Sequence, residues 1–559
     1  MTRSVRLERP PRLTRLLLVG SMFTMGACGL VYEYVLSTLA TYLLGNSIDQ
    51  FSLIIGLMMF MMGAAAGLQS FVKRDLLDAF LFVEIILALL GGTSGLLVYL
   101  AYGWTEHFRL VLYFLVSCVG FAIGLEIPLL LRINRDYAAS LRTNLSQILS
   151  MDYVGALIGA MVWTYVLRRT FGIVQVGFVL GLFNLSIAAV GLVYFWPLLR
   201  HPRRMGVLTA VAGGVLTFAA LRAPDWTAAA EQRLFNDPVV YSGTSDYQQI
   251  TITERGDRLR FYINGHLQFS SRDEAIYHEL LVHPALSLRP EPHRVLILGG
   301  GDGLALREVL KYPSVRRVDL VDLDPKMIEL GKTHPRLVAL NEGSLLDARV
   351  HASVAELAST GERVPIDKTS ERPVGRVIGE SGRLGEVHVV TVDAARFLDE
   401  SEGDPYDVVI VDFPDPSTVE LAKLYSREMY RSLRSHLARG GLCVIQSGSP
   451  YHAKEAFLCV GRTLVAAGFE AVPYHDHVPS FGEWGFWIAR AETTDVRVPL
   501  EKELRGLKAL SVDTRYLTPE LTRAALSFGQ GWLQTADNSV NSLLDPVIVD
   551  LHRRGWREE

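Results

Sequence analysis

Residues 294–303 read Arg-Val-Leu-Ile-Leu-Gly-Gly-Gly-Asp-Gly, an apolar run that passes directly into a glycine-rich turn. A short apolar run bounded by turn residues is typical of a strand buried in a parallel sheet. The glycines allow the backbone to approach a ligand where a side chain would clash. Because a helical pattern follows through Lys311, the stretch predicts a strand, a ligand-binding turn and a helix.

The alternation of strand and helix continues along the chain. Further strands are expected at Val318–Asp322, Val387–Val392, Tyr406–Val411 and Leu442–Gln446. This pattern predicts a doubly wound α/β sheet of the Rossmann-like, methyltransferase type, whose ligands bind at the carboxyl ends of the strands. We therefore expect a nucleotide-binding catalytic domain over residues 291–495.

Aspartates follow these strands at the edge where a ligand would bind. Asp322 ends the second strand at the spacing at which a carboxylate accepts hydrogen bonds from both ribose hydroxyls of a nucleotide. Asp393 follows a later strand and is expected to contact the adenine amino group. Asp302 lies in the glycine turn, where a carboxylate would repel a pyrophosphate but hold the cationic tail of an S-adenosyl-type donor. For Asp302 and Asp322, capping of the next helix is the alternative.

Composition divides the chain into two parts. The chain has 559 residues, too many for one ordinary domain, and 49% of them are hydrophobic. Apolar runs fill residues 14–222, whereas residues 223–559 have a soluble composition. The net charge of −4 gives no indication of nucleic-acid binding. The four cysteines lack metal-ligand spacing, so we expect neither a metal site nor a disulfide framework.

The apolar runs are long enough to cross a membrane, because a helix needs about 20 apolar residues to span a bilayer core of ~30 Å. We predict a transmembrane domain over residues 1–222, multi-pass in the cell inner membrane, with six to seven spans. Candidate spans are residues 14–37, 51–71, 79–102, 110–131, 148–167, 172–197 and 205–222. Four acids lie within these runs, where carboxylates are often functional, although pairing inside the bundle is the alternative; they are Glu33, Glu84, Glu126 and Asp152.

Basic residues suggest an orientation for these spans. Lys and Arg gather in the N-terminal tail and after the second, fourth and sixth spans, which the positive-inside tendency assigns to the cytoplasm. Seven crossings would then leave the soluble part outside, whereas an adenosyl-type donor is a cytoplasmic metabolite. We therefore expect a cytoplasmic catalytic domain, with residues 205–222 re-entrant or at the membrane interface.

The remaining segments flank the catalytic domain. Residues 223–290 are predicted as a linker followed by a β-hairpin, Gln249–Thr253 and Leu259–Ile263, and a helix near Asp273–Leu288. Residues 352–385 are rich in Gly, Ser, Arg and Glu and are interpreted as a surface insert. Residues 496–559 are expected to form a helical tail.

Several local signatures lie between about Tyr247 and Ala489. They are Tyr247-Gln248, Asn264–Gln268, Asp273-Glu274, Tyr277–Glu279, Gly299–Gly303, Asp412–Pro416, Leu424–Ser426 and Phe481–Phe486. Together they resemble the spermidine synthase, or polyamine aminopropyltransferase, family. The apolar N-terminal part is similar to the membrane-bound bacterial subgroup of that family.

The resemblance implies transfer of an aminopropyl group from decarboxylated S-adenosylmethionine, a co-substrate, to an amine. Putrescine is the expected acceptor, giving spermidine and methylthioadenosine, with no permanently bound cofactor and a homo-oligomer of at least two chains. Asp412 would be the catalytic base. The donor would be bound by Gln248, Gly299, Gly301, Asp302, Asp322, Asp393 and Ala394. The acceptor would be bound by Gln268, Tyr277, His278, Asp415 and Phe481.

The chain departs from the family pattern mainly around the expected acceptor site. Phe413 and Pro414 replace small hydroxyl residues between the two acids, and Phe481 stands where tyrosine is common. Two alternatives remain open at this point. One is an S-adenosylmethionine-dependent methyltransferase, and the other is a non-catalytic membrane sensor or transporter of polyamines.

Overall fold

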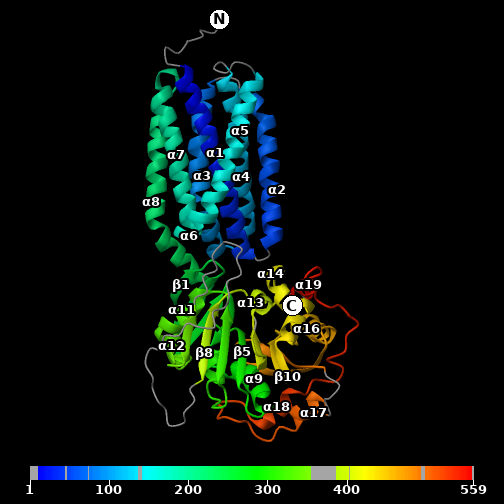
Figure 1. The fold of residues 1–559 in the computed structure, drawn as a ribbon. Coiled ribbons are helices and arrows are strands. Elements are labelled where there is room, and N and C mark those ends of the chain that lie inside the picture. The colour runs from blue at the N-terminus through cyan, green and yellow to red at the C-terminus, as the bar shows by residue number, and fades with distance from the viewer. Residues whose placement is uncertain are drawn as a thin grey trace. The chain divides into compact units, whose positions relative to one another are not determined.

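A computed structural model describes residues 11–44, 47–72, 75–135, 141–353, 385–401, 403–492 and 498–556. The chain divides into two compact units, Met1–Val239 and Val240–Glu559 (Figure 1). We call the first the helical unit and the second the sheet unit.

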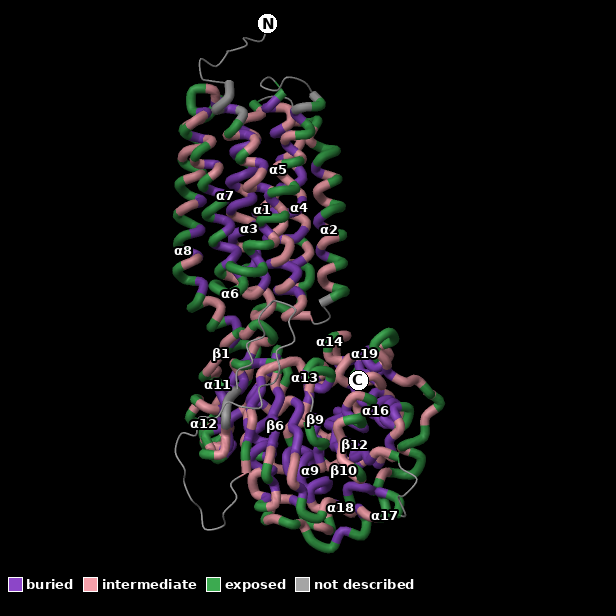
Figure 2. The backbone as a smooth tube through the Cα atoms, viewed as in Figure 1, coloured by how far each residue is buried: buried purple, intermediate pink, exposed green. Residues whose placement is uncertain are grey.

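The helical unit is a bundle in which seven described helices are long and apolar enough to cross a membrane. Among them α3 is the most enclosed, whereas α2 and α8 turn most of their surface outward (Figure 2). Large apolar side chains such as Phe60 and Val193 are about 70% exposed on the outside of the bundle. The helices are α1 (Pro11–Leu44), α2 (Ser47–Leu68), α3 (Leu76–Trp104), α4 (Phe108–Asn134), α5 (Leu141–Val162), α6 (Arg168–Thr170), α7 (Ile173–Phe195) and α8 (Pro202–Leu234).

The last helix of this unit differs from the sequence expectation. α8 does not end at residue 222 but runs over 33 residues, from Pro202 to Leu234, and the boundary between the units follows Val239. Hydropathy marks where a helix becomes polar, whereas the alanines at 228–230 keep the backbone helical beyond that point. Leu216 and Ala219 of α8 pack into one core with Ile85 and Phe178, so residues 205–222 are part of the helical bundle.

The sheet unit begins with a four-stranded sheet of order β1-β2-β3-β4. The predicted hairpin is present, with Ile252 opposite Phe261 in antiparallel register. Phe261 and Phe269 stack at 5.0 Å and belong to a core that also includes Leu304 and Met327. The strands are β1 (Val239–Thr244), β2 (Gln249–Arg255), β3 (Arg258–Ile263) and β4 (His266–Ser270).

The main sheet has eight strands in the order β11-β12-β10-β9-β5-β6-β8-β7. Its strands from β10 to β7 are parallel, as predicted, but β12 and β11 are antiparallel, so the sheet is mixed. The sequence interpretation missed this edge hairpin, because it predicted no strand after Leu442–Gln446. The strands are β5 (Arg294–Gly299), β6 (Arg317–Asp322), β7 (Val350–Ser353), β8 (Glu386–Thr391), β9 (Tyr406–Asp412), β10 (Leu437–Gln446), β11 (Phe469–Val478) and β12 (Gly482–Ala491).

Helices cover both faces of this sheet, because its central strands are apolar on both sides. In β5, Val295 and Ile297 enter one core, whereas Leu296 and Leu298 enter the other. The predicted insert lies almost wholly outside the described residues. The helices are α9 (Glu274–Leu288), α10 (Leu304–Val309), α11 (Pro325–Thr333), α12 (Pro335–Leu340), α13 (Ala394–Glu400), α14 (Val419–Ala422), α15 (Arg427–Ser435), α16 (Lys454–Ala466), α17 (Leu500–Arg505), α18 (Pro519–Ala525) and α19 (Val547–Gly555).

The order of the strands creates a switch point between β5 and β9. The chain leaves β5 toward α10, whose Leu306 belongs to one core, and leaves β9 toward Tyr425 and Met429, which belong to the other. In such a sheet, the connections diverge at the carboxyl ends of these strands and leave a crevice where ligands bind. The fold therefore points to the ends of β5 and β9.

Candidate active site

The site is built on a close approach of two strand ends. Gly299 of β5 pairs with Asp412 of β9, and a Cβ at residue 299 would collide with the carbonyl oxygen of Asp412. Gly299 also has φ of 87°, which favours glycine. A Cβ at Gly301 would lie 2.7 Å from Asp322 Oδ2. The glycine turn therefore fits closely between two of the predicted carboxylates.

Asp322 is held by the turn at the end of β6. Its Oδ2 accepts a hydrogen bond from the Gly301 amide at 2.9 Å, and its Oδ1 accepts one from the Asp324 amide at 2.8 Å. Gln248 is linked to it indirectly, because the Gln248 amide donates to Asp324 Oδ2 at 2.8 Å. Burial raises the pKa of Asp322 to about 6, even though these two amides favour its ionised form.

Asp302 lies in the same turn and faces the end of β9. Its Oδ1 accepts a hydrogen bond from the Leu304 amide at 2.8 Å, although the N-cap of α10 is Gly303. Burial raises the pKa of Asp302 to about 6, and the charge of Asp412 adds to the rise while His278 opposes it. The carboxylates of Asp302, Asp322 and Asp412 are therefore close enough to influence one another.

Asp412 is anchored by α9. The Tyr277 hydroxyl donates to Asp412 Oδ1 at 2.5 Å, which leaves Oδ2 toward Gly300, where a Cβ would lie 3.5 Å away. Burial raises the pKa of Asp412, although His278 and the Tyr277 hydroxyl oppose it. The Tyr277 ring lies 6.5 Å from that of Phe481. The structure thus brings these predicted residues together at one point.

Asp415 is held from two elements that the sequence analysis did not connect to it. The Gln446 side chain at the end of β10 donates to Asp415 Oδ1 at 3.0 Å. His552 of the tail helix α19 places Nε2 3.3 Å from Asp415 Oδ2. The same nitrogen lies 3.1 Å from the Trp556 indole nitrogen, so it can donate to Asp415 or accept from Trp556, but not both.

A buried ion network supports α9 beside this point. Glu274 accepts hydrogen bonds from Arg307 at 2.9 Å and Arg515 at 3.0 Å, and its Oε2 lies 2.9 Å from His278 Nδ1. Burial raises the pKa of Glu274, but His278 and Arg307 outweigh it and lower the pKa to about 2. Burial lowers the pKa of His278, but Glu274 outweighs it and raises the pKa. Of this network the sequence analysis gave a binding role only to His278; the four-residue spacing of Glu274 and His278 on one helix was the signal it could have used for Glu274.

Asp393 lies at the start of α13, where backbone amides and a lysine bind its two carboxylate oxygens. Its Oδ1 accepts hydrogen bonds from the amides of Ala395 and Arg396, and its Oδ2 accepts one from Lys423 Nζ at 2.6 Å. Burial raises the pKa of Asp393, but Lys423 outweighs it and the net shift is downward. Ala394 is buried next to it as the first residue of α13. Lys423 was not named from the sequence, because a surface lysine thirty residues away gives no local signal.

Gln268 is the predicted residue least joined to this cluster. It lies half-buried on β4, and its amide nitrogen donates to the carbonyl of His266 at 3.1 Å. Only its neighbour Phe269 approaches the site, with its ring 6.4 Å from that of His278. β4 thus brings Gln268 near α9 without a contact to the central carboxylates.

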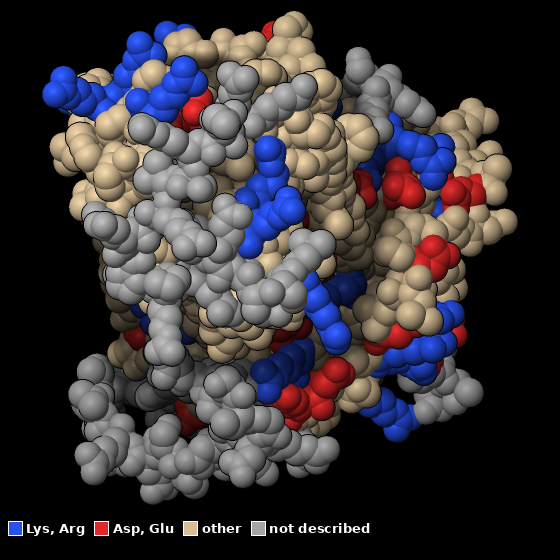
Figure 3. Space-filling model, turned by 90° about the horizontal axis from the view of Figure 1, so that it is seen from above, with Lys and Arg blue, Asp and Glu red and all other residues tan. Residues whose placement is uncertain are grey.

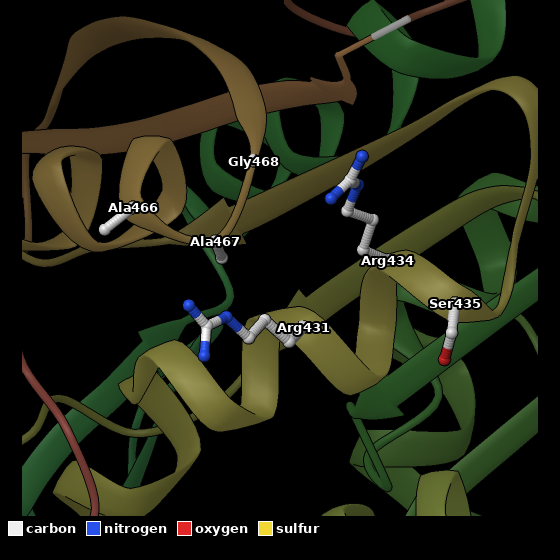
Figure 4. A pocket seen from close by; sticks show the side chains of 6 residues that line it. All are labelled: Arg431, Arg434, Ser435, Ala466, Ala467 and Gly468. Atoms are coloured by element: carbon white, nitrogen blue, oxygen red, sulfur yellow. The ribbon is translucent and has the colours of Figure 1, made fainter.

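Two other features could be mistaken for the site. Glu279, His283 and Glu308 lie close enough to share a metal ion, but Glu279 accepts backbone amides from residues 515–517, and His283 bonds to Glu308 at 2.9 Å. A surface hollow of about 480 Å³ lies between α15 and α16, away from every predicted residue (Figure 4). It is lined by Arg431, Arg434, Ser435, Ala466, Ala467 and Gly468, and its arginines complement the carboxyl end of α16.

The fold and site define an enzyme of nucleotide-type ligands, and the known relatives specify its class. The spermine/spermidine synthase domain matches residues 274–357 and 384–501. Polyamine aminopropyltransferase 2 of Ralstonia nicotianae is 41% identical over 518 residues, 92% of this chain and 92% of that protein. The polyamine aminopropyltransferase of Leptospira interrogans is 36% identical over 540 residues, 96% of this chain and 98% of that protein.

The chain therefore belongs to the polyamine aminopropyltransferase family, and it is an aminopropyltransferase. The family and enzyme class predicted from the sequence are confirmed, and the methyltransferase and non-catalytic alternatives are not supported. A crystal structure of spermidine synthase with the transition-state analogue AdoDATO is also similar, with a TM-score of 0.40 and 24% identity, covering 52% of this chain and 86% of that chain.

Asp302→Asn is expected to stabilise the protein at pH 8. The pKa of Asp302 is about 6 in the folded chain and lower in the unfolded chain. Ionising Asp302 in the folded protein therefore lowers the free energy of unfolding, and this loss is complete above pH 6. The gain should be on the order of 1–3 kcal/mol at pH 8 and should vanish as the pH falls through 6 toward 4. Thermal unfolding of the full-length protein between pH 4 and 8 measures it.

Asp257→Asn is the control, because an exposed ion pair with Arg272 lowers the pKa of Asp257 and no stabilisation is expected. An Asp302→Asn protein that is less stable than wild type at pH 8 would contradict the prediction.

Proposed function

We propose that the enzyme transfers the aminopropyl group of decarboxylated S-adenosylmethionine to putrescine, giving spermidine and methylthioadenosine. The observation that carries this proposal is the convergence of Asp302, Asp322 and Asp412 at the switch point between β5 and β9. Both proposed substrates are cations, and a group of buried carboxylates favours cations over neutral or anionic ligands. No permanently bound cofactor is part of the proposed reaction.

The proposed donor lies across the glycine turn. Asp322 accepts hydrogen bonds from its ribose hydroxyls, since each carboxylate oxygen has a lone pair left after bonding to the Gly301 and Asp324 amides. Gln248 supports this end of the donor through Asp324. The base lies near Asp393 and Ala394, and Asp302 holds the donor's ammonium group.

Asp412 is the proposed base. An alkylamine has a pKa near ~10.4, so most acceptor molecules are protonated at neutral pH and cannot attack. Burial raises the pKa of Asp412, which makes it a better proton acceptor, and Tyr277 fixes one of its oxygens. The acceptor ammonium first gives one proton to Asp412. The neutral nitrogen then bonds to the methylene carbon, the carbon–sulfur bond breaks with its electron pair remaining on sulfur, and the sulfonium becomes a neutral thioether. The new secondary nitrogen keeps its two protons as an ammonium.

Asp415 is proposed to hold the far ammonium of the diamine. Asp415 lies in the loop that follows Asp412 and β9. Gln446 donates a hydrogen bond to one of its carboxylate oxygens, and His552 contacts the other. Tyr277, His278 and Phe481 form the wall on the α9 side, and Gln268 the outer edge. Two fixed carboxylates separated by a short loop match a short diamine, which is why putrescine is preferred to a monoamine. We also propose an assembly of at least two chains.

Asp412→Asn should lower the rate of aminopropyl transfer by about 100- to 10,000-fold, the usual contribution of positioned proton transfer. The amide keeps the shape of the carboxylate, so donor affinity should change only a few-fold. The rate is measured as methylthioadenosine released from decarboxylated S-adenosylmethionine and putrescine, and donor affinity by calorimetry.

Asp404→Asn removes an acid whose side chain is 86% exposed before β9 and should leave both measurements unchanged. Loss of donor binding in Asp412→Asn would count against the base role. Absence of methylthioadenosine release by the wild type with any diamine would overturn the proposed reaction.

His552→Ala should raise the KM for putrescine about tenfold with little change in kcat, because Asp415 loses one of its two fixed partners. His552→Gln should restore part of the effect, since the glutamine amide can also donate. Trp556→Phe should leave the KM for putrescine unchanged or lower it, because it removes the indole N–H that competes with Asp415 for His552 Nε2. Arg554→Ala on the same helix is the control; an unchanged KM in His552→Ala would show that Asp415 does not need the tail helix.

We propose that the helical unit lies in the cell inner membrane and that the sheet unit faces the cytoplasm. The seven long helices described in the helical unit have apolar outward faces, which suit contact with lipid. The proposed substrates are made in the cytoplasm, which favours that side for the enzyme. Figure 3 shows basic side chains on one face of the molecule. By sequence position, Arg132 and Arg135 lie at the end of α4, and Arg200 follows α7. With seven crossings, these residues and the N-terminus lie outside, against the positive-inside tendency.

A reporter that is active only outside the cell decides the orientation. Fused after Glu559 or after Leu44 it should be inactive, and fused at the N-terminus it should be active. A reporter active only inside should give the reverse pattern. Activity of the outside reporter after Glu559 would overturn the proposed orientation.

A further inference from the structure

The helical unit encloses carboxylates that have no partner in the described part of the chain. Glu84 of α3 is 0% exposed and Glu126 of α4 is 1% exposed. Both carboxylate oxygens of Glu84 and Oε1 of Glu126 are buried without a hydrogen bond. Buried carboxylates are normally paired or hydrogen-bonded, because loss of hydration is costly. These three oxygens therefore have room for hydrogen bonds that the described part of the chain does not supply.

Close helix contacts place these acids around one stretch of α1. The backbone of Gly26 lies against Asp152 of α5, since a Cβ there would be 2.7 Å from Asp152 Oδ1. Gly29 faces Ile123, which precedes Glu126 by about one turn of α4. Cys28 lies between these glycines and feels the charges of both Glu84 and Glu126, and Glu126 feels that of Asp152. Three helices therefore present a carboxylate to the same region of α1.

Two neutral polar side chains point to the same region. Tyr32 is 0% exposed, and its hydroxyl has no hydrogen-bond partner. It lies one turn of α1 beyond Cys28 and interacts electrostatically with Glu84 and Glu126. Its ring is fixed against Gly91, where a Cβ would come within 2.6 Å. Tyr32 is thus a buried group, independent of the acids, that needs a partner in the same place.

Asn184 of α7 is the second such side chain. It is 0% exposed, and both its amide oxygen and its amide nitrogen are buried without a partner. Gly181, about one turn away, packs against the carbonyl of Ala88, which is itself one turn from Glu84 on α3. The partnerless amide therefore lies close to the level of Glu84.

The sequence supplies no cation to this region. Lys, Arg and His are absent from residues 16–44, 47–72, 76–104, 110–131, 143–167 and 173–199. A compact metal cage does not fit either, because within the described ranges the only trio of acidic, cysteine or histidine ligands close enough for one ion lies in the sheet unit. Separate carboxylates among apolar side chains suit an elongated organic cation, whose ammonium groups meet the acids and whose methylenes meet the walls.

We propose that the helical unit binds an alkylammonium ion of the diamine or polyamine class at Glu84 and Glu126, with Tyr32 as a further contact. The choice of ligand class rests on the proposed function, since the enzyme would consume and produce such ions. The site is separate from the catalytic carboxylates, which all belong to the sheet unit. It gives the helical unit a binding role beyond anchoring the enzyme.

Equilibrium binding of radiolabelled spermidine to the full-length protein in detergent tests this proposal. The measurements use an Asp415→Asn background, which weakens binding at the proposed catalytic site. We expect saturable binding that Glu84→Gln and Glu126→Gln each weaken at least tenfold. Glu33→Gln is the matched control, because it removes a half-buried acid of α1 outside the cluster and should leave binding unchanged. Unlabelled putrescine should compete, whereas sodium and magnesium chloride at equal concentration should not.

The same substitutions made without Asp415→Asn separate the two proposals. Glu84→Gln should keep wild-type kcat and KM for aminopropyl transfer, and it should elute as a folded protein, since glutamine removes a buried charge without changing shape. Equal spermidine binding in Glu84→Gln, Glu126→Gln and the background protein would overturn the inference. Displacement by sodium or magnesium but not by putrescine would also overturn it. Failure of transfer with retained, Glu84-dependent binding would overturn the proposed function alone.

Discussion

The close contact between Gly299 and Asp412 is the constraint on which the candidate site depends. Strands β5 and β9 are in register up to this pair, and no side chain larger than hydrogen fits at residue 299. Because the two strand ends meet here, the turn that follows β5 passes between Asp322 and Asp412 and carries Asp302 with it. Burial raises the pKa of each of these three carboxyls, and the charge of Asp412 adds to the rise at Asp302 while that of Asp302 adds to the rise at Asp322.

The sequence predicted the parts of this arrangement that local pattern determines. An apolar run ending in glycines and further runs ending in aspartates place the residues at one sheet edge by topology alone. It could not predict contacts made by segments distant in the chain, such as His552 at Asp415, Lys423 at Asp393 or Arg515 at Glu274. The antiparallel hairpin β11–β12 was missed because strands at a sheet edge carry weaker apolar patterns than β5 or β9. The extension of α8 was missed because hydropathy reports the surroundings of a helix and not its length.

Both units store unfavourable charge, and they do so in different ways. In the sheet unit, structural acids such as Glu274 form hydrogen bonds with arginine and histidine side chains. In the described part of the chain, Asp302, Asp322 and Asp412 form no hydrogen bond or ion pair with a basic side chain. In the helical unit, the stretches of α3 and α4 that carry Glu84 and Glu126, residues 76–104 and 110–131, contain no Lys, Arg or His. A folded protein retains such costs where they serve binding. Unpaired acids therefore mark the centre of each proposed site, whereas Asp393 and Asp415 at the edge of the proposed catalytic site are paired with Lys423 and His552.

The charge balance of the proposed reaction explains why carboxylates would be spread over several elements. The donor carries a sulfonium and an ammonium, and the diamine carries two ammonium groups. After transfer, methylthioadenosine is neutral and the remaining charge is gathered on one triamine. The triamine would contact Asp302 through the transferred group and Asp412 and Asp415 through the original diamine. Product would then be held at least as firmly as acceptor, because the triamine keeps both contacts of the diamine and adds the contact with Asp302.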